Sequence, residues 1–178
     1  MPGHTQKLTL SAMFLALGVL FPILFHAVGL GSVFLPMYWP IAAAGFFLPF
    51  TFAVLVGILT PVLSFLLTGM PPVSPPILHA RAVELFCLSG AVCLVYGRTR
   101  WHPFWILFLS LFVSRMSLLF AAMVLAPMFG LPAKWISFAS ILQGLPGIVV
   151  MLLLIPVIVG RIHTGFMRKM RDPHERDA

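Results

Sequence analysis

Three charged side chains, Arg81, Glu84 and Arg115, interrupt stretches of the sequence that are otherwise apolar. Of the 178 residues, 61% are hydrophobic and 8% are charged, whereas soluble domains carry about 25% charged residues. This composition excludes a water-soluble domain and indicates helices that cross a membrane. A charged side chain inside such a helix costs about 2.5–3.5 kcal/mol, so the three residues are candidates for a functional site.

The three residues are expected to lie at one depth in the membrane. Glu84 precedes Arg98 by 14 residues and Arg115 follows Arg100 by 15, and both Arg98 and Arg100 mark inner helix ends. The rise per residue then places both side chains roughly 21 Å from the inner boundary, in the outer half of the membrane. Arg81 and Glu84 are three residues apart and share one helix face.

Two arginines against one glutamate leave a net charge of +1 in this layer. A carboxylate on a bound ligand could neutralise that charge through a bidentate contact with a guanidinium. The alternative is an ion pair of Glu84 with Arg81 or Arg115 that only stabilises packing, since an unpaired buried carboxylate is costly. Arg81 could also extend to the outer lipid headgroups.

Further polar residues are predicted at the same level. Gln143 follows Lys134 by nine residues and so falls in the outer half of the last apolar segment. His26 and His79 lie at the outer ends of the first and fourth segments. Polar groups from four helices therefore converge at one depth, which predicts a pocket that opens to the exterior.

Aromatic residues near the start of the second segment allow two interpretations. Trp39 and its neighbours Phe34, Met37 and Tyr38 could stack on a flat ligand. Aromatic residues at this depth are, however, typical of the belt at the membrane interface, which is the favoured interpretation.

The sequence gives little support for a metal site or an enzyme active site. Cys87 lies one turn inward from Glu84 and could ligate a metal such as the cobalt of a corrinoid, but a lone buried cysteine is usually a small hydrophobic residue. Cys93 is six residues further along, so no disulfide framework is expected. The motifs H-E-x-x-H, G-x-S-x-G and the P-loop are absent and no second carboxylate lies in the spans, so neither catalysis nor a cofactor is expected.

Six apolar segments must position these residues, and they predict an all-α membrane bundle that forms a single domain over residues 1–178. Breaks at glycine, proline or charged residues delimit the predicted spans, which lie near 8–28, 35–49, 50–68, 77–97, 103–129 and 134–161, with a cytoplasmic tail over 162–178. The weakest break contains no charge and rests on Pro49 alone.

Charge counting favours six spans with both termini in the cytoplasm. Eight basic residues then lie inside and only Lys134 lies in an outer loop; the eight are Lys7, Arg98, Arg100, Arg161, Arg168, Lys169, Arg171 and Arg176. If 35–68 were one helix, the basic loop at Arg98 and the basic C-terminal segment would both lie outside. The net charge of +7 is therefore interpreted as membrane topology and not as nucleic-acid binding.

Small residues in the first span suit close helix packing. Ala12 and Ala16 are one helical turn apart, with Ser11 and Gly18 nearby, and this spacing lets another helix approach closely. The approaching helix could belong to a partner subunit or to this chain itself.

These features together resemble the S component, the substrate-capturing subunit, of an energy-coupling factor (ECF) vitamin transporter. The resemblance covers roughly residues 8–161. It rests on the six-span plan, the Ala12-x-x-x-Ala16 pattern, the segments Phe34-Leu35-Pro36-Met37 and Leu66-Leu67-Thr68-Gly69-Met70-Pro71-Pro72, and the helix that contains Glu84.

The resemblance implies a high-affinity site for a vitamin or its precursor near the outer face of a bacterial cytoplasmic membrane. Helices four to six and the loops after helices one and three, including Met70, would form it. It also implies that Ala12 and Ala16 pack against a transmembrane coupling subunit, and that this subunit and two ATPase subunits drive toppling of the S component in the membrane.

The sequence leaves the substrate class open. The excess positive charge favours a carboxylate-bearing vitamin such as pantothenate, biotin or lipoate. Cys87 or His79 as a cobalt ligand would instead favour a corrinoid. A protein of another class, a non-transport membrane scaffold, would need no ligand pocket.

Overall fold

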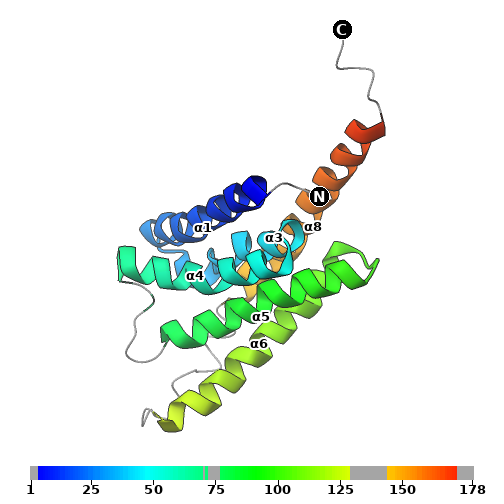
Figure 1. The fold of residues 1–178 in the computed structure, drawn as a ribbon. Coiled ribbons are helices and arrows are strands. Elements are labelled where there is room, and N and C mark those ends of the chain that lie inside the picture. Colours follow the sequence, from blue (N-terminus) through cyan, green and yellow to red (C-terminus); the bar gives the residue numbers. More distant parts are fainter. Residues whose placement is uncertain (1–3, 70, 72–76, 129–143, 172–178) are drawn as a thin grey trace.

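The computed structural model describes residues 4–69, 71, 77–128 and 144–171 (Figure 1). Within these residues all regular structure is helical, which confirms the predicted all-α bundle. The helices are α1 (His4–Ala27), α2 (Gly31–Phe34), α3 (Tyr38–Phe47), α4 (Phe50–Thr68), α5 (Ile77–Arg98), α6 (Pro103–Met128) and α8 (Leu145–Arg171).

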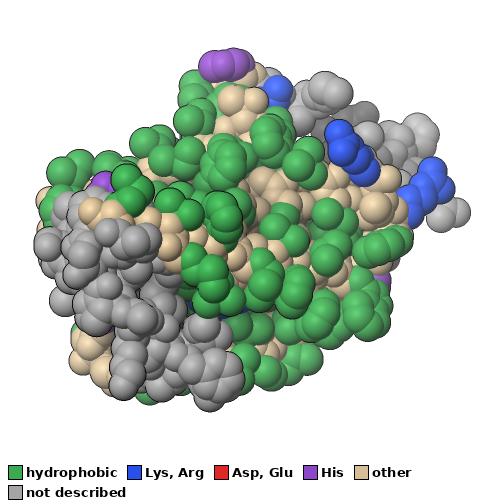
Figure 2. All heavy atoms as spheres, turned by 90° about the horizontal axis from the view of Figure 1, so that it is seen from below, with side chains coloured by type: hydrophobic (Ala, Val, Ile, Leu, Met, Phe, Trp, Pro, Cys, Tyr) green, Lys and Arg blue, Asp and Glu red, His purple; other side chains and the backbone are tan. Residues whose placement is uncertain are grey.

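Five of the described helices, namely α1, α4, α5, α6 and α8, are long and apolar enough to cross a membrane. Their outward surfaces are rich in large apolar side chains, with Leu66, Leu67, Phe120 and Met123 between 69% and 76% exposed. Figure 2 shows hydrophobic side chains spread over much of the described part of one face, with lysine and arginine side chains towards the upper right. Such a surface suits a protein surrounded by lipid rather than water.

The region predicted as the second span, 35–49, contains only a short helix. α3 has 10 residues, and a helix of that length covers about 15 Å, half of a hydrocarbon core of about 30 Å. Proline explains the end of α3, because the residue before a proline disfavours the helical conformation. Leu35, before Pro36, is left-handed with φ 47° and ψ 53°, and Leu48, before Pro49, is extended.

α3 is a core element despite its shortness. It packs against α1, α4, α5 and α8, and most of its side chains are buried. Tyr38, the first residue of α3, is 3% exposed. The short helix therefore brings its amino-terminal end into the interior of the bundle.

Glycines draw α3 and α4 close to α5. A Cβ atom at Gly57 of α4 would lie 2.6 Å from Ser89 Oγ and 2.7 Å from the Leu85 carbonyl oxygen. A Cβ atom at Gly45 of α3 would lie 2.7 Å from Val92 Cβ. α5 is thus tightly enclosed, and the side chains on its inner face, including Glu84, are fully buried.

The arrangement of the helix ends agrees with the predicted topology. Figure 1 shows the start of α1, the connection from α5 to α6 and the end of α8 at the same side of the bundle. Lys7, Arg98, Arg100 and Arg161 belong to these parts of the chain. α8 also continues to Arg171, ten residues beyond the predicted end of the last span at 161, because the next proline after Pro156 is Pro173.

Candidate functional site

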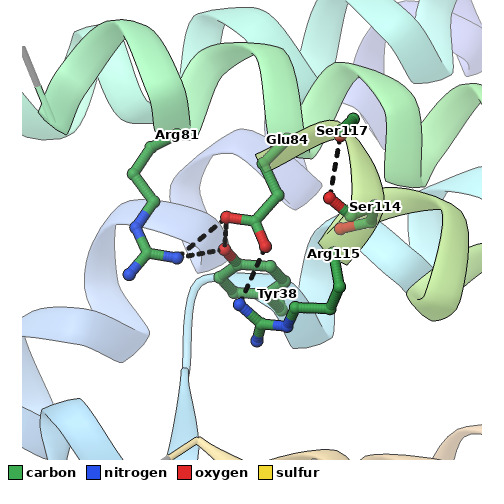
Figure 3. Close-up of polar contacts among 6 residues, drawn as sticks. All are labelled: Tyr38, Arg81, Glu84, Ser114, Arg115 and Ser117. Carbon is green, nitrogen blue, oxygen red and sulfur yellow. Dashed lines mark hydrogen bonds and ion pairs between the residues drawn. The ribbon is translucent and has the colours of Figure 1, made fainter. Parts of the chain in front are cut away.

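The buried carboxylate of Glu84 is the centre of a polar cluster. Glu84 lies in the second turn of α5 and is 0% exposed. Its Oε2 is 2.9 Å from Nη1 of Arg81, and its Oε1 is 2.9 Å from Nη1 of Arg115 (Figure 3). Each carboxylate oxygen thus pairs with one guanidinium. Glu84 therefore has both Arg81 and Arg115 as partners.

Tyr38 completes this cluster from α3. Its hydroxyl donates a hydrogen bond to Oε2 of Glu84 and accepts one from Nη1 of Arg81. The Cζ atoms of Arg81 and Arg115 lie 5.7 Å and 5.2 Å from the centre of the phenol ring, within the range of cation–π attraction. We refer to Tyr38, Arg81, Glu84 and Arg115 as the arginine–glutamate cluster.

The packing of three helices explains how the cluster assembles. Arg81 and Glu84 lie three residues apart and form an i,i+3 pair on α5. α6 runs back along α5 after a short connection, so equal distances from that connection bring Arg115 level with Glu84. Tyr38 is positioned by a third helix, because it is the first residue of α3 and α3 packs against α5.

The sequence does not predict this role of Tyr38, since it favours the interfacial belt for Tyr38 and Trp39 alike. The structure places its hydroxyl in the interior instead. A signal was present in the sequence, because a buried tyrosine hydroxyl usually needs a hydrogen-bond partner and three charged residues were available in neighbouring helices.

Arg115 uses only one of its three nitrogen atoms within the described part of the chain. Nε and Nη2 are buried and have no hydrogen-bond partner there. The side chain is 13% exposed, compared with 30% for Arg81. Two guanidinium cations against one carboxylate leave the cluster with a formal charge of +1, and two donors of Arg115 remain available.

The start of α8 lies beside this free edge of Arg115. A Cβ atom at Gly144 would lie 3.6 Å from Nη2 of Arg115 and 2.6 Å from Cδ1 of Leu35. Gly147 is in such close contact with the carbonyl group of Phe34 that a side chain there would collide with it. The corner between α2 and α3 is therefore packed against the first turn of α8, next to the cluster.

Trp39 and His26 are positioned near this corner and not within the cluster. The indole Nε1 of Trp39 donates a hydrogen bond of 2.9 Å to the Phe34 carbonyl, and its ring lies 6.2 Å from that of Phe25. Nδ1 of His26 is 2.8 Å from the Pro22 carbonyl oxygen, and its ring contacts Gly31. Both residues hold the junction of α1, α2 and α3.

The remaining predicted residues are placed as follows. His79 is exposed in the first turn of α5, and Cys87 is partly buried on the same helix. Cys93 donates a weak hydrogen bond of 3.5 Å to the Leu48 carbonyl. Across residues 4–69, 77–128 and 144–171, no three histidine, cysteine or acidic side chains form a group that could hold a metal. Met70, Lys134 and Gln143 lie outside the described residues.

Two different small-residue faces are present on α1. Ser11 and Gly18 are buried, and a Cβ atom at Gly18 would lie 2.5 Å from Cγ2 of Thr60 on α4. Ala12 and Ala16 are exposed. Within the described chain, the small residues that pack against this protein's own helices are thus Ser11 and Gly18, and the Ala12–Ala16 face is open.

Comparison with known families gives one match. A family model described as the substrate-specific component of ECF transporters matches residues 6–159, a range that contains every member of the arginine–glutamate cluster. Neither a search of curated proteins nor a search of solved structures found a match.

Proposed function

The chain belongs to the family of ECF transporter substrate-specific components, and from this premise we propose that it captures a carboxylate-bearing vitamin or vitamin precursor at the outer face of the membrane. Members of this family are multi-pass transport subunits that bind a small molecule and work with a membrane coupling subunit and ATPases. Membership in a transport family also disfavours the non-transport scaffold considered from the sequence.

The charge imbalance of the arginine–glutamate cluster is the observation that carries the proposal. A cluster that served only to fix helix packing would be most stable with equal numbers of opposite charges. Here two cations surround one carboxylate, and the second carboxylate that would balance them is not found in the described chain. A substrate carboxylate would restore neutrality.

The position of the cluster supports capture from outside. Arg81 and Glu84 lie in the first two turns of α5, far from its basic end at Arg98. Since basic ends mark the cytoplasmic side, the cluster is expected in the outer half of the membrane. His26, His79, Trp39, Met70 and Gln143 remain predicted as further contacts around the substrate.

The partners follow from the family and from α1. The sequence contains no P-loop, so ATP hydrolysis would be supplied by two ATPase subunits. The exposed Ala12–Ala16 face is the surface we propose for the transmembrane coupling subunit. The bacterial cytoplasmic membrane is the proposed location.

The direct test is identification of the small molecule that copurifies with the protein. We expect mass spectrometry of the extracted ligand to find a compound with a carboxylate. Calorimetry with pantothenate, biotin and lipoate, each added to the protein freed of that ligand, is expected to show saturable binding of at least one acid. A corrinoid in the extract would favour the cobalt alternative, with Cys87 or His79 as ligand, and would contradict the carboxylate proposal.

A further inference from the structure

One edge of the Arg115 guanidinium is left free in the interior of the protein. Nη1 donates to Glu84, whereas Nε and Nη2 are buried and have no acceptor among residues 4–69, 77–128 and 144–171. In Figure 3 these two nitrogens lie on the side of the guanidinium turned away from Glu84. Leaving buried donors of a charged group without a partner is costly, so this edge is expected to be filled when the protein is occupied.

The shape of this free edge indicates what fills it. The Nε–H and Nη2–H bonds of a guanidinium run nearly parallel, and their spacing matches the two oxygens of a carboxylate. A hydroxyl or an amide oxygen offers a single acceptor atom, so it cannot accept two parallel hydrogen bonds. The edge therefore selects a planar group with two acceptors.

Arg81 does not present an equivalent edge. Its Nη1 bonds to both Glu84 and Tyr38, and its side chain is 30% exposed, so its remaining donors lie nearer to the surface. The buried unpartnered nitrogens found in the described chain belong to Arg115. The two arginines of the cluster thus have different roles, although both contact Glu84.

Gly144 and Leu35 shape the space next to the free edge. A Cβ atom at Gly144 would lie 3.6 Å from Nη2 of Arg115 but only 2.6 Å from Cδ1 of Leu35, so the Leu35 side chain packs directly against the glycine beside this edge. Leu35 has the left-handed backbone conformation that leucine rarely adopts. Its carbonyl accepts a hydrogen bond of 2.9 Å from the Tyr38 backbone, which ties its position to the cluster.

We propose that the Nε–Nη2 edge of Arg115 holds the substrate carboxylate side-on, next to the first turn of α8 and the side chain of Leu35. This assignment rests on the proposed capture of a small organic acid. Because the empty cluster carries a formal charge of +1, one carboxylate makes it neutral. The substrate class is therefore a molecule with a single carboxylate and no other charge, in preference to a dianion or a neutral amide.

The first experiment observes Arg115 directly with the smallest carboxylate as probe. Protein labelled with ¹⁵N at arginine Nε contains eight arginines, and the Arg115 signal is assigned by its loss in Arg115→Lys. In lipid nanodiscs, sodium acetate is expected to shift the Arg115 Nε–H signal, whereas acetamide and sodium chloride at matched ionic strength are not. A shift of Arg81 in place of Arg115, or no shift, would overturn the assignment.

The second experiment separates the effect of the two parallel donors of Arg115 from the effect of its charge. Arg115→Lys keeps the positive charge but loses the two parallel donors, and Arg100→Lys, at an exposed position outside the cluster, is the matched control. Wild type and Arg100→Lys are expected to prefer a vitamin acid over its primary amide by about tenfold or more, and Arg115→Lys is expected to lose that preference. Retention of the preference in Arg115→Lys would overturn the assignment.

A third variant tests the space at the edge. Gly144→Ala places a methyl group 3.6 Å from Nη2 and would displace the side chain of Leu35, so it is expected to weaken binding of the acid severalfold. Gly97→Ala, where a Cβ atom meets nothing within 4 Å, is expected to leave binding unchanged. Equal affinities for both variants would contradict the role given to Gly144. If vitamin acids bind but Arg115 does not discriminate acid from amide, only this assignment fails. If no carboxylate compound binds the wild type, the proposed function fails as well.

Discussion

α5 and α1 are both apolar helices long enough to cross the membrane, yet they present opposite kinds of surface. α5 is enclosed by α3, α4 and α6, and it buries a carboxylate with its two cations. α1 packs on α3 and α4 with its Ser11–Gly18 face and leaves Ala12 and Ala16 exposed. Under the proposed function, the buried face of α5 would recognise the substrate and the exposed face of α1 would bind a partner.

Removal of the shared carboxylate should have the largest effect on the α5 side. Glu84→Ala leaves two guanidiniums in the interior without their anion, and breaking a buried pair in this way costs about 3–5 kcal/mol. We expect a strongly lowered thermal midpoint and loss of ligand binding. Ser89→Ala, on the same buried face of α5, removes a hydroxyl bonded only within the helix and should cost far less. Equal midpoints for the two variants would contradict a central role for Glu84.

Arg115→Ala should come next, with its main effect on binding. Loss of charge-assisted hydrogen bonds of about 1.5–3 kcal/mol corresponds to about tenfold to hundredfold weaker affinity. The variant is expected to insert in the membrane normally, because it removes a charge from the interior. Calorimetry against Arg100→Ala, an exposed arginine at the basic end of the bundle, checks this expectation. Unchanged binding in Arg115→Ala would count against the site.

Tyr38→Phe should have a moderate effect. The variant keeps the ring that faces both guanidiniums but removes the hydroxyl that bonds to Glu84 and Arg81. The expected cost is about 1–2 kcal/mol of stability, with a severalfold loss of affinity. Tyr96→Phe is the matched control, since it alters the other tyrosine of the chain, whose ring packs on Phe46. The thermal midpoints and dissociation constants of the two variants should therefore differ. Identical values would contradict a role of the Tyr38 hydroxyl in stability and binding.

Changes on α1 should have the smallest effect on binding. Ala12→Leu together with Ala16→Leu adds bulk to an exposed face and is expected to leave the dissociation constant unchanged. Uptake by cells that carry the complete transporter should nevertheless fall strongly, because the coupling subunit could no longer approach closely. Met13→Leu, which exchanges an exposed side chain of α1 for one of similar volume, should affect neither measurement. Loss of binding in the alanine double variant would indicate misfolding and weaken the contrast between the two helices.

The sequence predicts the depth of the charged residues better than it predicts their partners. Rise per residue is constant along a helix, so the positions of Arg98 and Arg100 were enough to place Glu84 and Arg115 at one level. The neighbour that a side chain faces depends on how the helices pack around it. Spacing alone therefore could not show that Glu84 contacts both arginines. For the same reason, spacing could not show that the hydroxyl of Tyr38 contacts Glu84 and Arg81.

Helix lengths were predictable where proline and charge mark the ends. The break at Pro49 is confirmed by the end of α3 at Phe47 and the start of α4 at Phe50. The shortness of α3 was not predicted, because an apolar run gives the same signal in a membrane span and in a buried core helix. The left-handed conformation of Leu35 is also not predictable from the sequence, since leucine rarely adopts a positive φ.

The glycines at 45 and 57 set how closely α3 and α4 approach α5. At these crossings a Cβ atom would come within 2.7 Å of α5 atoms, so any larger residue would push the helices apart. Arg81 and Glu84 belong to α5 and Tyr38 belongs to α3, so such a displacement would alter the distances within the cluster although none of its residues had changed. The spacing of the cluster therefore depends on two glycines that lie outside it.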